Sequence, residues 1–276
     1  VTPNVVLRQV RVDHLTMYKV AAAGHAARAG VFAARLARAG MEGPHLPFEG
    51  KAGWSSNVAG EKKFELDEFA GAGRHFKIVS SQLKFRPCAG NTISSVLAAE
   101  KLGPLHTYED VKHVTVEVYD RAKIASASAA HFWNPESAET ADHSIPYLVA
   151  VAMIDGTLTR QSYDNERLWS PRVRELMRKI EVIENDAFTR AYEGTPQAHH
   201  TRITLVMKSG EKRIAESGGD ADDVATPKSD AQVTAKFHAL TQDALGRERV
   251  EPVLECLWNL ERAREVARLV SMFDLG

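Results

Sequence analysis

The sequence predicts an α+β protein in which a helical domain is interrupted by an inserted α+β domain. The beginning and the end of the chain have helical periodicity, whereas the middle mixes alternating, strand-like segments with helices. We expect residues 1–72 to be part of the helical domain and 73–228 to be the α+β domain. Residues 229–276 are then C-terminal helices that return to the helical domain and pack against its first part.

Composition and charge exclude several classes of protein. The 276 residues are 44% hydrophobic and 26% charged, as in a globular chain that buries a sizeable core. The 35 Lys and Arg residues balance the 36 Asp and Glu residues, so no global field attracts nucleic acid or an anionic membrane. No apolar run approaches the ~20 residues that span a bilayer, and two cysteines cannot build a disulfide framework. We therefore expect a cytoplasmic protein without a nucleic-acid or membrane partner.

The predicted elements follow from local patterns. Ala-rich residues 17–40 predict a helix whose small side chains suit close packing against other helices, with Gly40 as its end. Alternation of apolar and polar residues predicts a strand or strand pair over 76–85 and a strand over 111–119. Between them the sequence predicts a short helix capped by Asn91 or Thr92. Together these elements imply a βαβ-like unit. The remaining predictions are an apolar helix over 144–154, a helix opened by Ser170-Pro171, a strand at 179–184, a hairpin of 201–208 and 211–215, a polar loop at 218–229, and helices over 230–273.

The sequence contains none of the short motifs that mark several common classes of enzyme. The chain lacks GxGxxG, Walker A, GxSxG and HExxH motifs. His199 and His200 are adjacent on a predicted strand and point to opposite faces, so we expect surface residues at a strand start rather than a metal site. Cys88 is either a nucleophile or a small core residue, and the burial preference of cysteine favours the inert core residue.

Three segments of the chain contain residue types that are typical of ligand-binding or catalytic sites. Lys19 stands at the start of the Ala-rich helix, where it either covers apolar surface with its stem or serves a site. Lys84 and Arg86 precede a turn and a helix N-terminus, which suits either a carboxylate site or solvated charges. Residues 134–147 crowd Asp, His, Ser and Tyr in front of the apolar helix, where Asp142 or Ser144 can act as the N-cap.

These three places together resemble the MmgE/PrpD family, which includes 2-methylcitrate dehydratases, cis-aconitate decarboxylases and iminodisuccinate epimerase. The matching features, in the same order and spacing along nearly the whole chain, are Lys19 with Gly24-His25-Ala26-Ala27-Arg28-Ala29-Gly30, Gly43-Pro44 with Phe48-Glu49-Gly50, Lys84 before Pro87-Cys88, and Glu139 to Tyr147 with Asp155-Gly156.

The resemblance implies an all-helical domain interrupted by an α+β lid and a reaction that uses no metal and no other cofactor. The substrate implied is a small di- or tricarboxylate that reacts at the carbon beside a carboxylate. By resemblance, Lys19, Lys84 and Tyr147 line the site and His143 lies beside it. We assign substrate binding to Lys19, Lys84 and Arg86 and catalysis to His143 and Tyr147. Fixed ammonium groups suit this chemistry, because removing a proton next to a carboxylate adds negative charge to it.

The chain also departs from its relatives. Many have a His where Ile93 stands here, and family members carry a long helical segment before the Lys19 motif that supplies further Asp and His residues. We therefore interpret the chain as the C-terminal part of the family chain, with the missing segment or a separate chain as a partner. A homodimer is expected from the resemblance.

The function expected from this resemblance is dehydration of a 2-methylcitrate-like hydroxy-tricarboxylate through abstraction of an α-proton. The alternatives are decarboxylation or epimerisation of a related acid, and a non-catalytic partial chain that needs an N-terminal partner.

Overall fold

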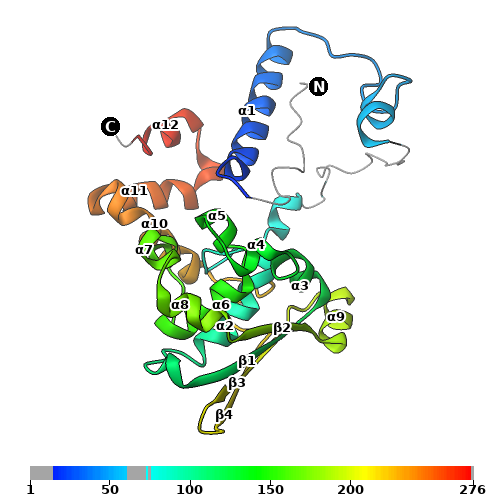
Figure 1. The fold of residues 1–276 in the computed structure, drawn as a ribbon. Helices are drawn as coiled ribbons and strands as arrows, with labels where there is room; N and C mark the ends of the chain where they lie inside the picture. The colour runs from blue at the N-terminus through cyan, green and yellow to red at the C-terminus, as the bar shows by residue number, and fades with distance from the viewer. Residues whose placement is uncertain (1–14, 61–72, 74–75, 275–276) are drawn as a thin grey trace.

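A four-stranded mixed sheet lies at one end of the molecule, in the order β2-β1-β3-β4 (Figure 1). The computed structural model describes residues 15–60, 73 and 76–274. The strands are β1 (Val111–Val118), β2 (Ile180–Glu184), β3 (Thr201–Met207) and β4 (Lys212–Ser217). The helices are α1 (Tyr18–Arg38), α2 (Ile93–Glu100), α3 (Asp120–Ser126), α4 (Ala130–Trp133), α5 (Ala138–Ala141), α6 (Ile145–Asp155), α7 (Asn165–Leu168), α8 (Pro171–Met177), α9 (Asp186–Glu193), α10 (Asp230–Leu245), α11 (Arg247–Trp258) and α12 (Val266–Ser271). The protein is thus α+β, as the sequence predicts.

The strands pair as their alternating sequences require. In β1 the buried valines alternate with more exposed polar residues, so one face of the strand enters the core. β1 pairs in parallel with β2 and antiparallel with β3, and β3 pairs antiparallel with β4. The turn between β3 and β4 uses Gly210, whose positive φ of 89° suits glycine. The predictions of the strands 111–119 and 179–184 and of the hairpin are confirmed.

Helices α2 and α6 cover one face of the sheet and pack against each other. α6 is buried along almost its whole length, which explains why its sequence is apolar on every side. Ser144 caps its N-terminus, because its Oγ accepts a hydrogen bond from the backbone N–H of Tyr147 at 3.1 Å. Gly156 ends it in a left-handed conformation with φ of 77°. The apolar helix predicted over 144–154 is therefore confirmed, with Ser144 rather than Asp142 as its cap.

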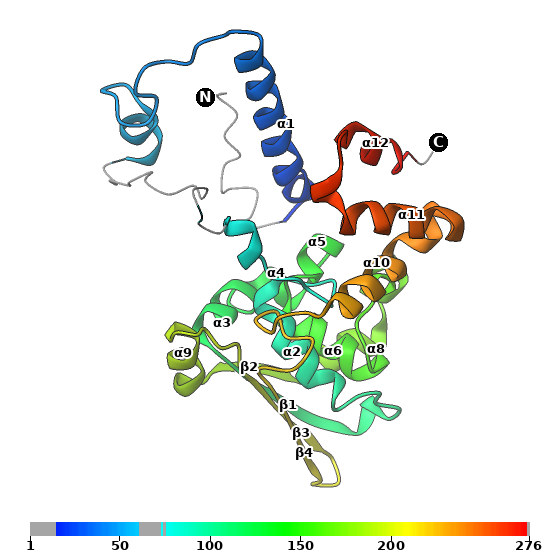
Figure 2. The ribbon, with the colours of Figure 1, turned by 180° about the vertical axis from the view of Figure 1, so that it is seen from behind.

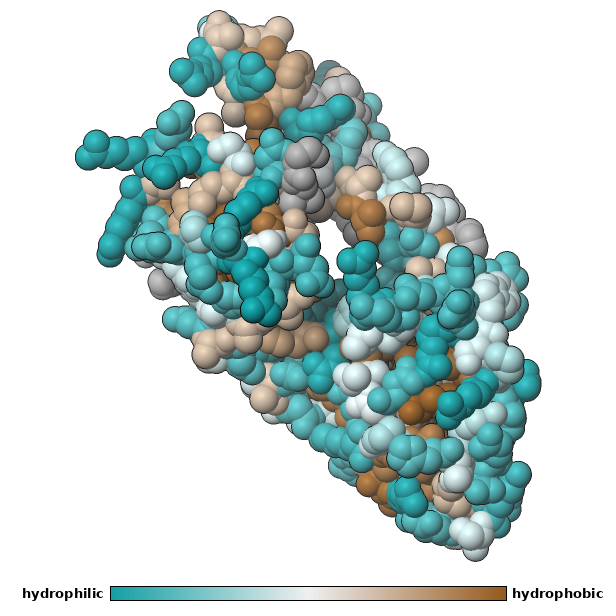
Figure 3. Space-filling model, turned by 90° about the vertical axis from the view of Figure 1, so that its left-hand side faces the viewer, coloured by the Kyte–Doolittle hydropathy of each residue, from teal (hydrophilic) through white to brown (hydrophobic). Residues whose placement is uncertain are grey.

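Helix α1 projects away from the part of the molecule that contains the sheet, in both ribbon views (Figures 1 and 2). Lys19 is its only buried residue, whereas Val20, Val31 and Phe32 are exposed. The close packing expected of its small residues is not observed in the described part of the chain. Apolar surface is also exposed in patches among polar surface in the space-filling view (Figure 3).

The strand predicted at 76–85 is wrong. Residues Lys77–Ser80 form a short 3₁₀ turn, and the chain then runs without regular structure towards a second 3₁₀ turn, Gly90–Thr92. Ile78 and Val79 are exposed, so the apolar residues that suggested a strand have no sheet to pack on. The βαβ unit instead joins the parallel strands β1 and β2 through helices α3 to α8.

The C-terminal helices α10, α11 and α12 confirm the helical prediction for 230–273, and the segment 218–229 is a loop as expected. Within the ranges described above, no helix combines the length and apolar character needed to cross a membrane.

Candidate active site

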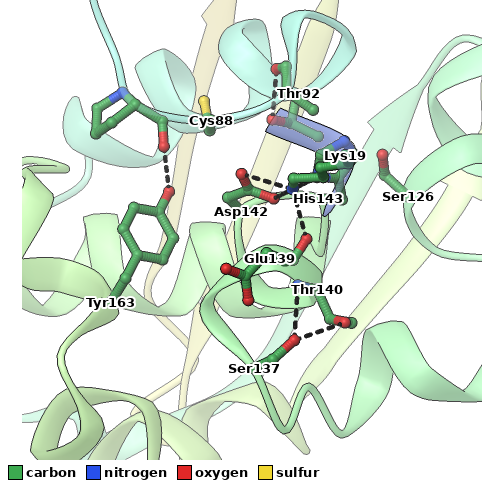
Figure 4. A network of polar contacts seen from close by, with 12 residues as sticks. Lys19, Cys88, Thr92, Ser126, Ser137, Glu139, Thr140, Asp142, His143 and Tyr163 are labelled. Carbon is green, nitrogen blue, oxygen red and sulfur yellow. Dashed lines mark hydrogen bonds and ion pairs between the residues drawn. The ribbon is translucent and has the colours of Figure 1, made fainter. Parts of the chain in front are cut away.

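The ammonium group of Lys19 joins the first turn of α1 to the turn between α5 and α6. Its Nζ donates hydrogen bonds to the backbone carbonyl of Glu139 at 2.9 Å and to the Asp142 carboxylate at 2.9 and 3.1 Å (Figure 4). It also lies 3.3 Å from Nδ1 of His143. Lys19 is only 7% exposed, so this cation is enclosed by groups at least 120 residues away in the chain. The structure therefore brings Lys19 and His143 together.

Two helix caps hold Asp142 and His143 in place. The Ser137 hydroxyl accepts a hydrogen bond from the Thr140 N–H at 3.2 Å and starts α5, while Ser144 starts α6. Asp142 and His143 occupy the short turn between the two helices. Because the Asp142 N–H donates to the Ala138 carbonyl of α5 at 3.0 Å and Ser144 caps α6, the two side chains extend from a hydrogen-bonded turn.

The Asp142 carboxylate lies between the ammonium of Lys19 and the imidazole of His143. One of its oxygens contacts Nδ1 of His143. Since a carboxylate accepts hydrogen bonds, this contact favours Nδ1 as the donor, which leaves Nε2 as the nitrogen that exchanges a proton with a bound molecule. The side chain of His143 is 26% exposed, so it is open to a small molecule. A lysine, an aspartate and a histidine in this order can fix the tautomer of the imidazole and let it exchange a proton.

The loop before α2 lies against this turn. The Ala89 N–H donates to the carbonyl of Asp142 at 2.9 Å, and the Lys84 Nζ donates to the carbonyl of Cys88 at 2.7 Å. The peptide that joins Cys88 to Ala89 thus contacts both Asp142 and Lys84. The Tyr163 hydroxyl donates to the carbonyl of Pro87 at 2.6 Å and holds the loop from another side (Figure 4).

Arg86 is not brought to the lysine-aspartate-histidine cluster. Its guanidinium forms two hydrogen bonds with the carboxylate of Glu100, at 2.7 and 2.8 Å, and a third contact with Asp222 at 3.0 Å. The hydrogen bond with Glu100 is the main cause that raises the pKa of Arg86, although burial opposes it. Two carboxylates of the protein itself therefore occupy this fork, and substrate binding by Arg86 stays a prediction.

Tyr147 lies inside the core. It is fully buried, and its hydroxyl donates to the carbonyl of Ser162 at 2.6 Å. Desolvation raises the pKa of Tyr147 to about 12. A hydroxyl that is already donating within the core has no free proton to offer a substrate in this conformation, and the catalytic role assigned to Tyr147 stays a prediction.

The burial of Cys88 and His199 can be compared with the roles that the sequence predicts for them. Cys88 is 2% exposed and burial raises the pKa of its thiol to about 11, which fits the inert core residue.

The expectation that His199 is a surface residue is wrong. His199 is 8% exposed and lies against the rings of Tyr119 and Tyr192. Strand alternation explains this, because His199 lies two residues before Thr201, the first residue of β3, and so continues the face that enters the core.

Asp142 is the residue of the cluster to which the sequence reading assigned no chemistry. The sequence offers Asp142 as a helix cap, because a carboxylate before an apolar helix commonly has that role. Its position between two helix caps, next to His143, is the signal that could have identified it.

Comparisons with known proteins identify relatives. The model of the MmgE/PrpD C-terminal domain matches residues 87–261, and that of the MmgE/PrpD N-terminal domain matches residues 1–67. Human cis-aconitate decarboxylase is 22% identical over 261 residues, which cover 90% of this chain and 51% of the human protein. The mouse cis-aconitate decarboxylase is 26% identical over 140 residues, 50% of this chain and 28% of the mouse protein. The 2-methylcitrate dehydratase of Yarrowia lipolytica is 33% identical over 70 residues, 25% of this chain and 14% of that protein.

The two family matches follow each other along the chain and together include Lys19, Asp142 and His143. The chain spans about half the length of the human relative. Since the C-terminal match alone covers more than half of this chain, the chain belongs to the MmgE/PrpD family.

Proposed function

We propose that the protein is a lyase that transfers a proton at a carbon beside a carboxylate of a small di- or tricarboxylate. The observation that carries this proposal is the enclosed ion pair of Lys19 with Asp142, whose carboxylate also contacts Nδ1 of His143. The names of the relatives support it, because both a decarboxylase and a dehydratase of tricarboxylates develop negative charge on carbon next to a carboxylate.

His143 is the proton-transfer group in this proposal. Asp142 keeps its Nδ1 protonated, so Nε2 faces the substrate as a base in one direction and as an acid in the other. Lys19 balances the charge of Asp142 and keeps positive potential beside the reacting carbon. Lys84, which lies on the other side of the peptide that joins Cys88 to Ala89, binds a substrate carboxylate.

Decarboxylation is the first candidate reaction. Loss of carbon dioxide leaves an electron pair on carbon. The imidazolium form of His143 suffices to protonate that carbon from Nε2; the ring becomes neutral and regains its proton from water. Dehydration of a 2-methylcitrate-like acid is the second candidate, and it needs a further group that protonates the departing hydroxide. Tyr147, which the sequence analysis assigns to catalysis, has the chemistry for that step, but its hydroxyl donates to the carbonyl of Ser162 instead. This contact favours decarboxylation over dehydration.

The test incubates the purified 276-residue chain with cis-aconitate, 2-methylcitrate and related dicarboxylates and follows the products by proton NMR. Decarboxylation predicts a product with one carboxylate fewer, and dehydration predicts a new alkene with all carboxylates retained. Epimerisation leaves the mass unchanged and inverts one centre.

The non-catalytic alternative gives a different result in the same samples. It predicts that the chain binds a tricarboxylate without turnover until the preceding segment is supplied, either in the same chain or as a separate one. A chain that neither binds nor converts any of these acids contradicts the proposal.

A further inference from the structure

Two lysines from other parts of the chain lie over the ring of Phe85, the residue that follows Lys84. Lys228 from the 218–229 loop and Lys236 from α10 place their Nζ atoms 5.7 and 5.4 Å from the centre of the ring. Both distances are within the ~6 Å at which an ammonium is attracted to an aromatic face. Lys228 also donates to two carbonyls of its own loop, so most of its hydrogen-bonding capacity stabilises that loop.

Lys236 and Lys84 are linked through the backbone. The Nζ of Lys236 donates to the carbonyl of Lys84, and the Nζ of Lys84 donates to the carbonyl of Cys88 at 2.7 Å. An ammonium carries three N–H donors, and each of these two lysines uses one of them in these contacts. Two donors on each lysine are therefore available for a bound molecule.

The two ammonium groups also lack a neutralising carboxylate. Arg86 nearby is paired with Glu100 and Asp222, whereas in the described ranges neither Lys84 nor Lys236 forms an ion pair. Burial lowers the pKa of Lys236, and the positive charge of Lys84 lowers it further. Like charges repel each other, and an anion bound between these two ammonium groups lowers that repulsion.

Lys228, which lies over the same Phe85 ring as Lys236, lines a groove of about 400 Å³ whose walls include neither Lys84 nor Lys236. Leu83, the neighbour of Lys84 in the chain, lines one side, and Val224 to Lys228 line the other. Its size suits a small organic molecule, and its walls include apolar side chains that can contact a carbon skeleton.

We propose that Lys84 and Lys236 form a carboxylate-binding pair for a small polycarboxylate whose carbon skeleton lies in the groove beside Leu83. Lys236, on a C-terminal helix, is then a substrate-binding residue that neither the sequence nor the family resemblance had indicated. The identity of the ligand rests on the proposed function, whereas the anion-binding character of the pair rests on the geometry above.

The test measures binding of propane-1,2,3-tricarboxylate, which has no hydroxyl group to lose, to the whole 276-residue chain by isothermal titration calorimetry. Lys236→Gln and Lys84→Gln are each expected to raise the Kd at least about fivefold, because each removes a charged hydrogen bond to the ligand. The Kd of the double variant should rise by less than the product of the two single increases, since both lysines contact the same ligand. Lys212→Gln, at an exposed position of β4, removes the same charge and should change the Kd by less than about twofold.

Lys236→Arg separates binding from a purely structural role, because it keeps the charge and should keep the affinity close to that of the unmodified protein. Thermal unfolding of each variant shows whether the fold is retained. An unchanged Kd in Lys236→Gln overturns the proposal. So does a rise in Kd in Lys212→Gln that equals the rise in Lys236→Gln, or no binding of propane-1,2,3-tricarboxylate at all. Inorganic phosphate that binds as tightly as the tricarboxylate also overturns it. Turnover of the acids, which tests the proposed function, is measured separately and can succeed or fail independently.

Discussion

Among single residues, Asp142 has the most demanding role, because one carboxylate contacts two potential cations. Lys19 is almost fully enclosed and has no other carboxylate within ion-pair distance in the described part of the chain. Removing the charge of Asp142 therefore leaves a desolvated ammonium without its counter-charge. The same change removes the group that fixes the tautomer of His143.

Asp142→Asn is expected to lower the free energy of unfolding by about 1–3 kcal/mol, a range set below that for fully buried pairs because Asp142 is 28% exposed. Urea denaturation of the whole chain measures this change. Asp243→Asn, an exposed position on α10, is the matched control and should stay within about 0.5 kcal/mol. Equal stability of the two variants would show that the Lys19 contact contributes nothing to the fold.

His199 provides a pH-dependent prediction. Its Nδ1 has no hydrogen-bond partner within the described residues, and burial lowers its pKa from the ordinary value. The unfolded chain therefore binds a proton at His199 more readily than the folded chain does, and stability contributed by the neutral ring is lost as the pH falls below about 6.5.

Urea denaturation between about pH 7 and pH 5 should show this loss, and His199→Leu should reduce it by up to about 1.4 kcal/mol per pH unit. His106→Leu, at an exposed histidine, should leave the pH dependence as it is in the unmodified protein. The prediction fails if both variants have the same slope.

Single residues also show which features of the site could be predicted from the sequence and which could not. Helix caps and the histidine next to an apolar helix could be identified because their signals are local, as with Ser144 and His143. The contact between Lys19 and Asp142 could not be predicted from spacing, because 123 residues separate the two. The ion pairs of Arg86 with Glu100 and Asp222 could not be predicted for the same reason, since nothing local shows that these carboxylates approach it.

Among the elements, α6 positions the site. It is buried between α2, α8 and β2, and its first turn begins directly after His143. The Ser144 hydroxyl caps the helix and also donates to the carbonyl of Phe132 in α4. One side chain thus fixes both the start of the helix and the entry of the chain into it.

Ser144→Ala is expected to cost about 1–2 kcal/mol of stability, since a buried cap and a buried hydrogen bond are lost together. Thermal or urea unfolding measures the cost. Ser209→Ala, in the exposed turn between β3 and β4, should cost less than about 0.5 kcal/mol. Similar costs in the two variants would contradict the role of Ser144 in anchoring the turn.

Local periodicity was sufficient for most elements. The alternation in β1 and the apolar run of α6 each reflect direct burial against a neighbour, so pattern and structure agree. The segment 76–85 shows where a pattern fails, because its apolar residues alternate without a partner strand beside them. Pairing in a sheet depends on distant segments, which a short window does not contain.

For the whole molecule, the notable feature is the division between a well-packed α+β part and a helix, α1, that is exposed over most of its length. Lys19 is the buried contact of α1, and it ends at the candidate site. The position of α1 and the geometry around His143 are therefore coupled through one ion pair. The expected domain boundaries at 72 and 228, and the expected homodimer, stay predictions.

The central claim is that His143, held by Asp142, transfers the proton in the reaction of a tricarboxylate. The most direct test compares His143→Gln with the unmodified chain in the NMR assay of cis-aconitate and 2-methylcitrate, and in calorimetric binding of propane-1,2,3-tricarboxylate. The account predicts that turnover falls by at least about 100-fold, as for loss of a general acid or base, while the Kd changes by less than about threefold. Turnover within about threefold of the unmodified protein would contradict the claim.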